Sequence, residues 1–155
     1  MSGSTATERL AALGLTLPPV AAPVAAYVPA VRAGNYVYTS GQLPFVDGKL
    51  QVAGKVGDAV TPEDAASFAR TAALNALAAV AGAAGGLDSI ARVIKVTCFV
   101  ASTPGFTGQA QVANGASELL IEVLGEAGRH ARSAVGMAVL PLDSPVEVEL
   151  IAEAR

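Results

Sequence analysis

The sequence has few of the residues that build metal and redox sites. Its 155 residues include one cysteine, Cys98, and one histidine, His130. A single cysteine excludes an internal disulfide, and the common zinc sites need three or four Cys, His or carboxylate ligands. We therefore expect no metal site. Because the chain makes no use of disulfides, we expect a cytoplasmic protein.

Charge is also scarce. Only 15% of the residues are charged, and 10 Lys and Arg stand against 13 Asp and Glu, for a net charge of −3. A nucleic-acid-binding protein usually carries a basic face, because neutralising phosphates supplies its affinity. No such face is evident, so we expect no nucleic-acid partner.

Long hydrophobic runs are missing as well, although the chain is apolar overall. The longest uncharged apolar run, residues 76–87, consists mostly of Ala and Gly, whereas a membrane-spanning helix needs about 18 strongly apolar residues. We therefore expect no membrane partner. Yet apolar residues make up 52% of the chain. A small domain cannot bury all of them, which predicts apolar surface at subunit contacts and hence an oligomer.

Turn formers and apolar periodicity divide the chain into helices and strands. Gly34-Asn35 predicts a hairpin turn, and Thr61-Pro62 predicts the start of a helix. The apolar strand 91–101 looks covered on both faces. Five turn-forming residues join the last two strands, so we expect those strands to pair antiparallel. The expected elements are a short helix at 4–13, strands at 25–31 and 36–39, short extensions around Asp47-Gly48, helices at 61–82 and 107–126, and strands at 91–101, 131–140 and 146–152.

This β-β-α-β-α-β-β order predicts an α+β sandwich, in which two helices cover one face of a mixed sheet. We expect one domain at residues 21–155, preceded by an N-terminal extension at 1–20 that carries the short helix.

Three kinds of side chain are candidates for chemistry. Arg132 opens an otherwise apolar strand, where it lies either at a solvated end or in position to bind a carboxylate with its planar fork. Glu147 and Glu149 alternate with apolar residues and so share one face, which is either solvated or acts in acid–base chemistry. Cys98 and His130 are weaker candidates. We expect Cys98 to be a buried small hydrophobe rather than a nucleophile, and His130 to be an exposed or capping side chain at a helix–strand junction rather than part of a catalytic triad.

The expected hairpin also predicts how Arg132 and Glu147 relate. If Leu140 faces Val146 across the turn, Arg132 faces about Ala154, and Glu147 lies about seven rungs, or roughly 20 Å, from Arg132. The two side chains of one chain would then not meet. A site that uses both would have to be completed by another subunit.

Three stretches of the sequence resemble motifs of the RidA family, also called YjgF or endoribonuclease L-PSP. Residues 38–44, YTSGQLP, resemble its TSGQxP stretch, and residues 94–100, IKVTCFV, resemble its central strand. The C-terminal pattern ARSAV at 131–135, LP at 140–141 and VEVE at 146–149 resembles its ARSxV…LP…(I/V)E(I/V)E pattern. The resemblance runs from about Ala25 to the end of the chain.

The resemblance implies a chorismate-mutase-like fold and a homotrimer with clefts between subunits. It also implies hydrolysis of small enamine and imine carboxylates, such as 2-aminoacrylate, to 2-keto acids and ammonia without metal or cofactor. In this family the residue matching Arg132 binds the substrate carboxylate, and the one matching Glu147 positions water. The implied cleft lining comprises Tyr27, Ser40, Gly41, Asn114 and Ala134. Ala134 stands where the best-studied branch has Cys, and the second long helix keeps Asn114 but lacks that branch's aromatics, so the chain looks like a divergent branch.

Three functions remain open at this point. The first is the metal-free enamine/imine deaminase. The second is a non-catalytic trimer that binds small carboxylate metabolites through Arg132 alone. The third is RNA cleavage, which the low basic content and the single histidine disfavour.

Overall fold

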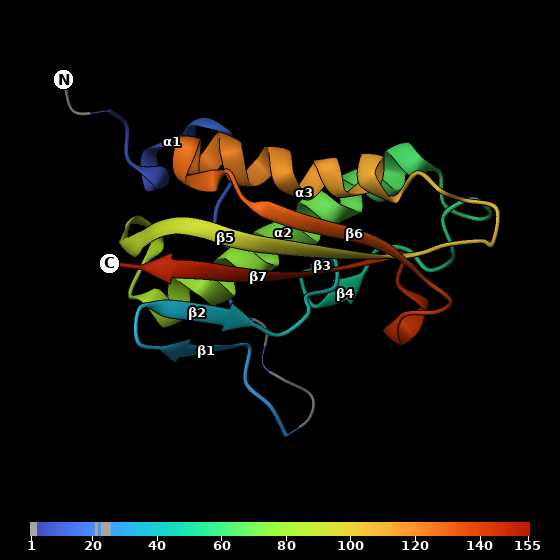
Figure 1. The fold of residues 1–155 in the computed structure, drawn as a ribbon, viewed down its shortest axis with the longest axis horizontal. Coiled ribbons are helices and arrows are strands. Elements are labelled where there is room, and N and C mark those ends of the chain that lie inside the picture. Colours follow the sequence, from blue (N-terminus) through green and yellow to red (C-terminus); the bar gives the residue numbers. More distant parts are fainter. Residues whose placement is uncertain (1–2, 21, 23–25) are drawn as a thin grey trace.

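The computed structural model describes residues 3–20, 22 and 26–155, and within these it contains one five-stranded sheet in the order β1-β2-β7-β5-β6. Only β5 and β6 run parallel, and the other neighbours are antiparallel. Figure 1 shows the strands side by side. Their bounds are β1 (Ala30–Ala33), β2 (Tyr36–Thr39), β5 (Ile90–Ala101), β6 (Ala131–Met137) and β7 (Val146–Ala154).

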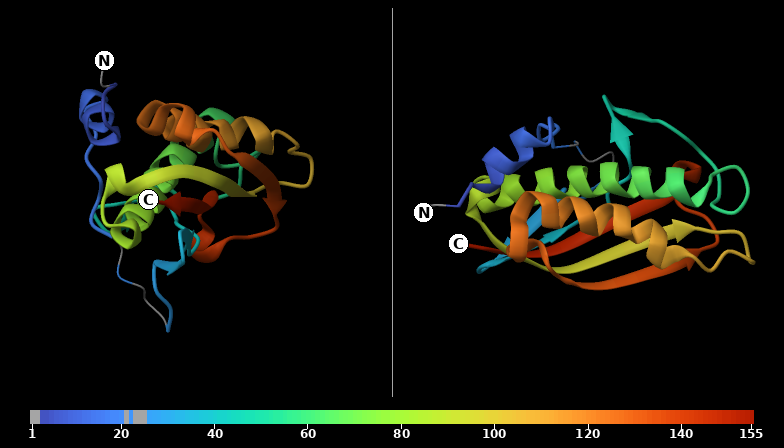
Figure 2. Two further views of the ribbon diagram at one scale, coloured as in Figure 1. Left: turned by 60° about the vertical axis from the view of Figure 1, so that its left-hand side comes forward. Right: turned by 90° about the horizontal axis from the view of Figure 1, so that it is seen from above.

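Two long helices cover one face of this sheet, which confirms the expected α+β architecture. They are α2 (Pro62–Ala84) and α3 (Gln109–Leu124), and Figure 2 shows both on the same side of the strands. The side chain of Thr61 accepts a hydrogen bond from the backbone N–H of Asp64 and so caps α2, as the sequence predicts.

The expected hairpin of the last two strands is wrong. β6 pairs with β5 in parallel, and β7 lies on the other side of β5. The cause is the β5-α3-β6 unit, because a strand that follows a crossover helix joins the sheet parallel to the first strand. The short helical turn η3 (Pro141–Asp143) then carries the chain past the end of β5 rather than closing a hairpin.

The other short elements follow the sequence closely. The Gly34-Asn35 turn joins β1 and β2, and Asp47-Gly48 joins the small hairpin of β3 (Phe45–Val46) and β4 (Lys49–Leu50). The strand expected at 25–31 begins at Ala30, and Ala25 lies outside the described residues.

The N-terminal helix α1 (Ala6–Ala12) packs against α3 and the turn η1 (Leu87–Ser89). Its Ala6 and Leu10 belong to the hydrophobic core. The backbone N–H and the hydroxyl of Thr7 donate to the Asp88 carboxylate at 3.0 and 2.8 Å, and these bonds lower the pKa of Asp88.

Among the residues that the structure describes, no helix lies over the second face of the sheet. In β7 the side chains alternate strictly, so Val146, Val148 and Leu150 are buried against the helical layer while the residues between them are half-buried. β5 likewise leaves Thr97 and Phe99 partly exposed. The expectation that both faces of this strand are covered is therefore wrong within one chain. Large apolar side chains stay exposed on this face or at its rim: Tyr36, Tyr38, Val135 and Met137.

Within the part of the chain that the structure describes, no helix combines the length and hydropathy needed to span a bilayer.

Small residues let α2 and α3 approach closely. A Cβ built on Gly115 in α3 would overlap the carbonyl group of Ala66 in α2, with its carbon at 2.7 Å. Helix propensity alone predicts that Gly115→Ala stabilises the protein by about 1 kcal/mol. The steric clash predicts the opposite sign, a destabilisation of about 1–3 kcal/mol, because the helices must separate.

Urea denaturation measures this difference in the free energy of unfolding. Gly105→Ala is the matched control, because a Cβ there meets no atom within 4 Å. A Gly115→Ala variant as stable as the wild type would contradict the close contact.

Candidate functional site

A hollow of about 300 Å³ lies beside Glu147 of β7. Its walls come from the segment before β1, the loop after β2, β3 and the η3 turn. Apolar groups dominate these walls, and Glu147 is the only ionisable carboxyl among them. The lining residues are Ala22, Tyr27, Pro29, Gly41, Gln42, Leu43, Phe45, Pro141, Leu142 and Glu147.

The absence of a side chain at Gly41 makes room for the Glu147 carboxyl group. A Cβ built on Gly41 would overlap Oε1 of Glu147 and lie 2.7 Å from its Cδ. Burial raises the pKa of Glu147, and the negative charge of Glu149 raises it further. A carboxylate with a raised pKa accepts a proton more readily than an ordinary glutamate does.

Two more of the expected cleft residues lie near this hollow. Tyr27 lines it, with half of its surface exposed. Ser40 does not line it, but its hydroxyl donates to the Val28 carbonyl at 2.6 Å and its N–H donates to the Pro29 carbonyl at 2.8 Å. Ser40 therefore holds the segment that carries Tyr27.

Arg132 lies in a different environment, against α3. Its Nη1 donates to Oδ1 of Asn114 at 2.8 Å and to Oγ of Ser117 at 3.1 Å. Its Nη2 donates to the Ala110 carbonyl at 3.3 Å. The sequence left two interpretations of Arg132 open, a solvated strand end and an anion-binding group. These hydrogen bonds hold the side chain in one orientation, which favours the anion-binding group.

One chain does not bring Arg132 and Glu147 together. In the β5 register Arg132 lies opposite Val96 and Glu147 opposite Phe99, on either side of β5. The two Cα atoms are thus two strands and three rungs apart, roughly 14 Å, which corrects the sequence-based estimate of 20 Å and the register that placed Arg132 beside Ala154. Arg132 also points to the helical face, whereas Glu147 points to the open face.

Cys98 and Ala134 are neighbours across β5 and β6. Cys98 is fully buried, and desolvation raises the pKa of its thiol to about 12, although the charge of Arg132 opposes the rise. The thiol is therefore not a nucleophile at neutral pH. Ala134 packs partly buried against the core, where it adds no polar group to the Arg132 environment.

The contacts of His130 were the part of the site least predictable from the sequence. The side chain is half-buried rather than exposed, with Nε2 at 2.8 Å from Oγ of Ser117 and Nδ1 at 2.6 Å from the Gly128 carbonyl. Desolvation lowers its pKa, and the charge of Arg132 acts in the same direction, against the hydrogen bond to Gly128. The sequence offered one indication of this cluster: Ser117 follows Asn114 by three residues, which puts both side chains on one face of the helix.

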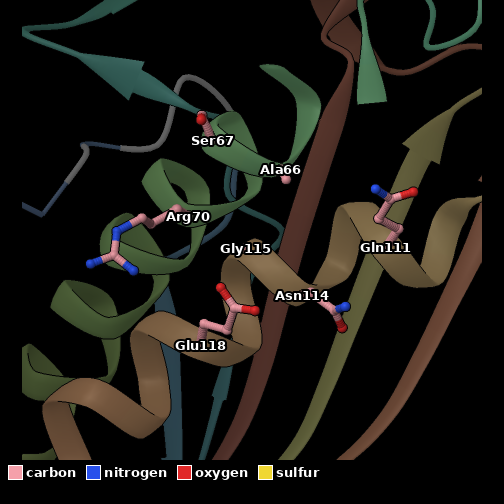
Figure 3. Close-up of a pocket in the computed structure, with 7 residues that line it drawn as sticks. All are labelled: Ala66, Ser67, Arg70, Gln111, Asn114, Gly115 and Glu118. Carbon is pink, nitrogen blue, oxygen red and sulfur yellow. The ribbon is translucent and has the colours of Figure 1, made fainter. Parts of the chain in front are cut away.

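A second hollow, of about 280 Å³, lies between α2 and α3. Figure 3 shows Ser67 and Arg70 on α2 and Gln111, Asn114 and Glu118 on α3. Arg70 already pairs with Glu122 at 2.7 Å, so its charge is matched by the protein itself. The hollow beside Glu147 is the better candidate site for this reason.

Across residues 3–20, 22 and 26–155, no three His, Cys, Asp or Glu side chains gather closely enough to hold a metal ion.

Comparisons with known proteins agree with this arrangement of elements. The profile of a family described as "YjgF/chorismate_mutase-like, putative endoribonuclease" matches residues 7–154. Protein TCP17 of Trypanosoma cruzi is 44% identical over 98% of this chain and 95% of its own. The crystal structure of Atu1372 from Agrobacterium tumefaciens is 51% identical, with a TM-score of 0.88 over 95% of this chain and 91% of its own.

A more distant relative was solved with a ligand. The structure of Escherichia coli TdcF with bound serine is 29% identical, with a TM-score of 0.62 over 90% of this chain and 94% of its own.

The electrostatics of Glu147 predict a measurable titration. We expect carbon-detected NMR of the Glu147 carboxyl to give a pKa above that of an ordinary glutamate, because burial disfavours the charged form. Glu149→Gln removes the neighbouring negative charge and is expected to lower the pKa of Glu147. Glu153→Gln, a more distant change on the same face of β7, should leave it almost unchanged. An ordinary pKa in the wild type would contradict the burial of this carboxyl group.

Proposed function

Because the chain belongs to the YjgF/chorismate mutase-like family, we propose that it hydrolyses small enamine and imine carboxylates, such as 2-aminoacrylate, to 2-keto acids and ammonia. The active sites are clefts between the subunits of a homotrimer, in which Arg132 of one chain meets Glu147 of another. The observation that carries the proposal is the Glu147 carboxyl group, held with a raised pKa in an apolar hollow.

The oligomeric part of the proposal rests on the separation within one chain. Arg132 and Glu147 project from opposite faces of the sheet. The open face carries exposed apolar side chains, among them Tyr36, Tyr38 and Val135. A second copy packed there would bury this surface and could bring its own Arg132 to the hollow of the first.

The proposed reaction needs an anchor, a water molecule and a proton acceptor. Arg132 binds the substrate carboxylate in bidentate geometry. Glu147 accepts a proton from water as the water oxygen bonds to the electrophilic imine carbon, and it passes this proton to the imine nitrogen, which gives a neutral carbinolamine. The hydroxyl proton of the carbinolamine then moves through Glu147 to the same nitrogen, the C–N bond breaks, and ammonia leaves as the C=O bond of the 2-keto acid forms. Tyr27 and Gly41 shape the space around the reacting carbon, and Asn114 supports Arg132.

The binding of a carboxylate has support from a relative, since TdcF was solved with bound serine. That support applies equally to the non-catalytic binder, in which Arg132 serves alone. The placement of Glu147 beside Gly41 favours the enzyme, because a binder has no use for a half-buried carboxyl group next to an anionic ligand. RNA cleavage has no comparable observation in its favour.

Turnover of freshly generated 2-aminoacrylate tests the proposal. We expect the wild type to accelerate pyruvate release. Glu147→Gln should lower kcat by about 10²- to 10⁴-fold, because it removes the general base. Arg132→Lys should mainly raise KM, because it keeps the charge but loses the bidentate fork.

Glu153→Gln is the matched control, since Glu153 lies on the same face of β7 but opposite Tyr36, away from the hollow. The contrary outcome has two parts: the wild type shows no turnover, and Glu147→Gln still binds 2-oxobutyrate. The protein would then be a carboxylate-binding protein and not an enzyme.

A further inference from the structure

The hydrogen-bond partners of Arg132 leave one edge of its guanidinium group free. Arginine has five N–H donors. Both hydrogens of Nη1 are used, by Asn114 and Ser117, and one of Nη2 by Ala110. Among the described residues, no acceptor bonds Nε–H or the second hydrogen of Nη2. Nε and Nη2 lie along one edge of the planar guanidinium group, and a carboxylate can bind such an edge with both oxygens.

The orientation of that fork depends on the Ser117 hydroxyl. The Gly128 carbonyl can only accept, so the proton on His130 is at Nδ1, which donates to it over 2.6 Å. In the neutral ring Nε2 is then an acceptor. The Ser117 hydroxyl donates to Nε2 over 2.8 Å, and its oxygen accepts from Nη1 of Arg132 over 3.1 Å. The direction of every bond is thereby fixed, from Arg132 through Ser117 to His130.

We propose that Ser117 and His130 are positioning residues for Arg132: the chain Arg132–Ser117–His130–Gly128 holds the guanidinium group so that its Nε/Nη2 edge faces the substrate carboxylate. This inference rests on the proposed function only for the identity of the ligand. The hydrogen bonds that position Arg132 lie within one chain and do not depend on that function. Desolvation and the nearby guanidinium charge lower the pKa of His130, which keeps the ring neutral and Nε2 an acceptor at neutral pH.

Three features set this role apart from a general structural one. Ser117 lies on α3, where alanine is the better helix former, so Ser117→Ala does not weaken the helix itself. His130 lies in the short connection between η2 (Gly125–Gly128) and β6, outside any helix or strand. Both ring nitrogens of His130 are already bonded, to Ser117 and to the Gly128 carbonyl. We therefore expect its effect on a ligand to pass through Ser117 and Arg132.

The first experiment measures the Arg132 side chain by nitrogen-15 NMR, whatever the protein catalyses. In the wild type we expect separate Nη1 and Nη2 signals, because three hydrogen bonds slow rotation about the Cζ–Nε bond. Ser117→Ala and His130→Leu should speed this rotation until the signals merge. Ser67→Ala, a serine replacement on α2, is the control. Unchanged Arg132 signals in Ser117→Ala would overturn the positioning role.

The second experiment measures the consequence for binding, with 2-oxobutyrate as the probe in titration calorimetry. Ser117→Ala and His130→Leu should each weaken binding by roughly tenfold, the scale of one hydrogen bond to a charged group. The double variant should be no weaker than either single variant, since both break the same chain. His130→Gln, whose amide oxygen can still accept from Ser117, should restore most of the affinity.

The same variants separate this inference from the proposed function. In turnover of 2-aminoacrylate we expect KM to rise while kcat stays within about twofold, because Glu147 is untouched. In an Arg132→Lys background, where turnover stays measurable, Ser117→Ala should raise KM much less than it does in the wild type. Additive losses there would overturn the positioning role while leaving the deaminase intact. A wild type that turns nothing over would overturn the deaminase, and the NMR result would still decide the positioning of Arg132.

Discussion

The strict alternation of side chains along β7 is the constraint on which the rest of the structure depends. Val146, Val148 and Leu150 must face the helical layer, because they complete the core beneath α2. Glu147, which lies between two of them, is therefore forced to the opposite face. A shift of one residue in this strand would bury the carboxylates and expose the core. The same packing that stabilises the fold thus fixes the direction in which the candidate catalytic group points.

β5 keeps the two candidate groups, Arg132 and Glu147, apart within one chain. It lies between β6 and β7, so Arg132 and Glu147 are separated by a whole strand, and the two side chains project from opposite faces. Each is placed by its own surroundings. Gly41 and an apolar hollow surround Glu147, and the polar side of α3 surrounds Arg132. Low polarity raises the pKa of the carboxyl group, while hydrogen bonds orient the guanidinium group.

Much of this was predictable from the sequence, where local chemistry decides the outcome. Thr61-Pro62 marks the start of α2, Gly34-Asn35 marks a hairpin, and the VEVE pattern puts Glu147 and Glu149 on one face. The pairing of the last strands was not predictable in this way. Five turn formers between two strands suggest a hairpin, but strand order is set by the crossover through α3, which is a property of the whole sheet. His130 shows the same limit at the site. Its importance comes from Ser117, which is distant enough in sequence that only the packing of α3 beside β6 brings the two together.

The central claim is that one active site takes Arg132 from one subunit and Glu147 from another. Coexpression of Arg132→Ala and Glu147→Gln chains under different affinity tags, with purification of the mixed oligomers, tests it most directly. In a mixed trimer, which holds two copies of one variant and one of the other, about one inter-subunit site in three combines the intact Arg132 of one variant with the intact Glu147 of the other. We predict that mixed oligomers recover roughly a third of the wild-type turnover of 2-aminoacrylate, while each variant alone is inactive. If the wild type is active and the mixed oligomers are as inactive as the parent variants, the site is not shared between subunits.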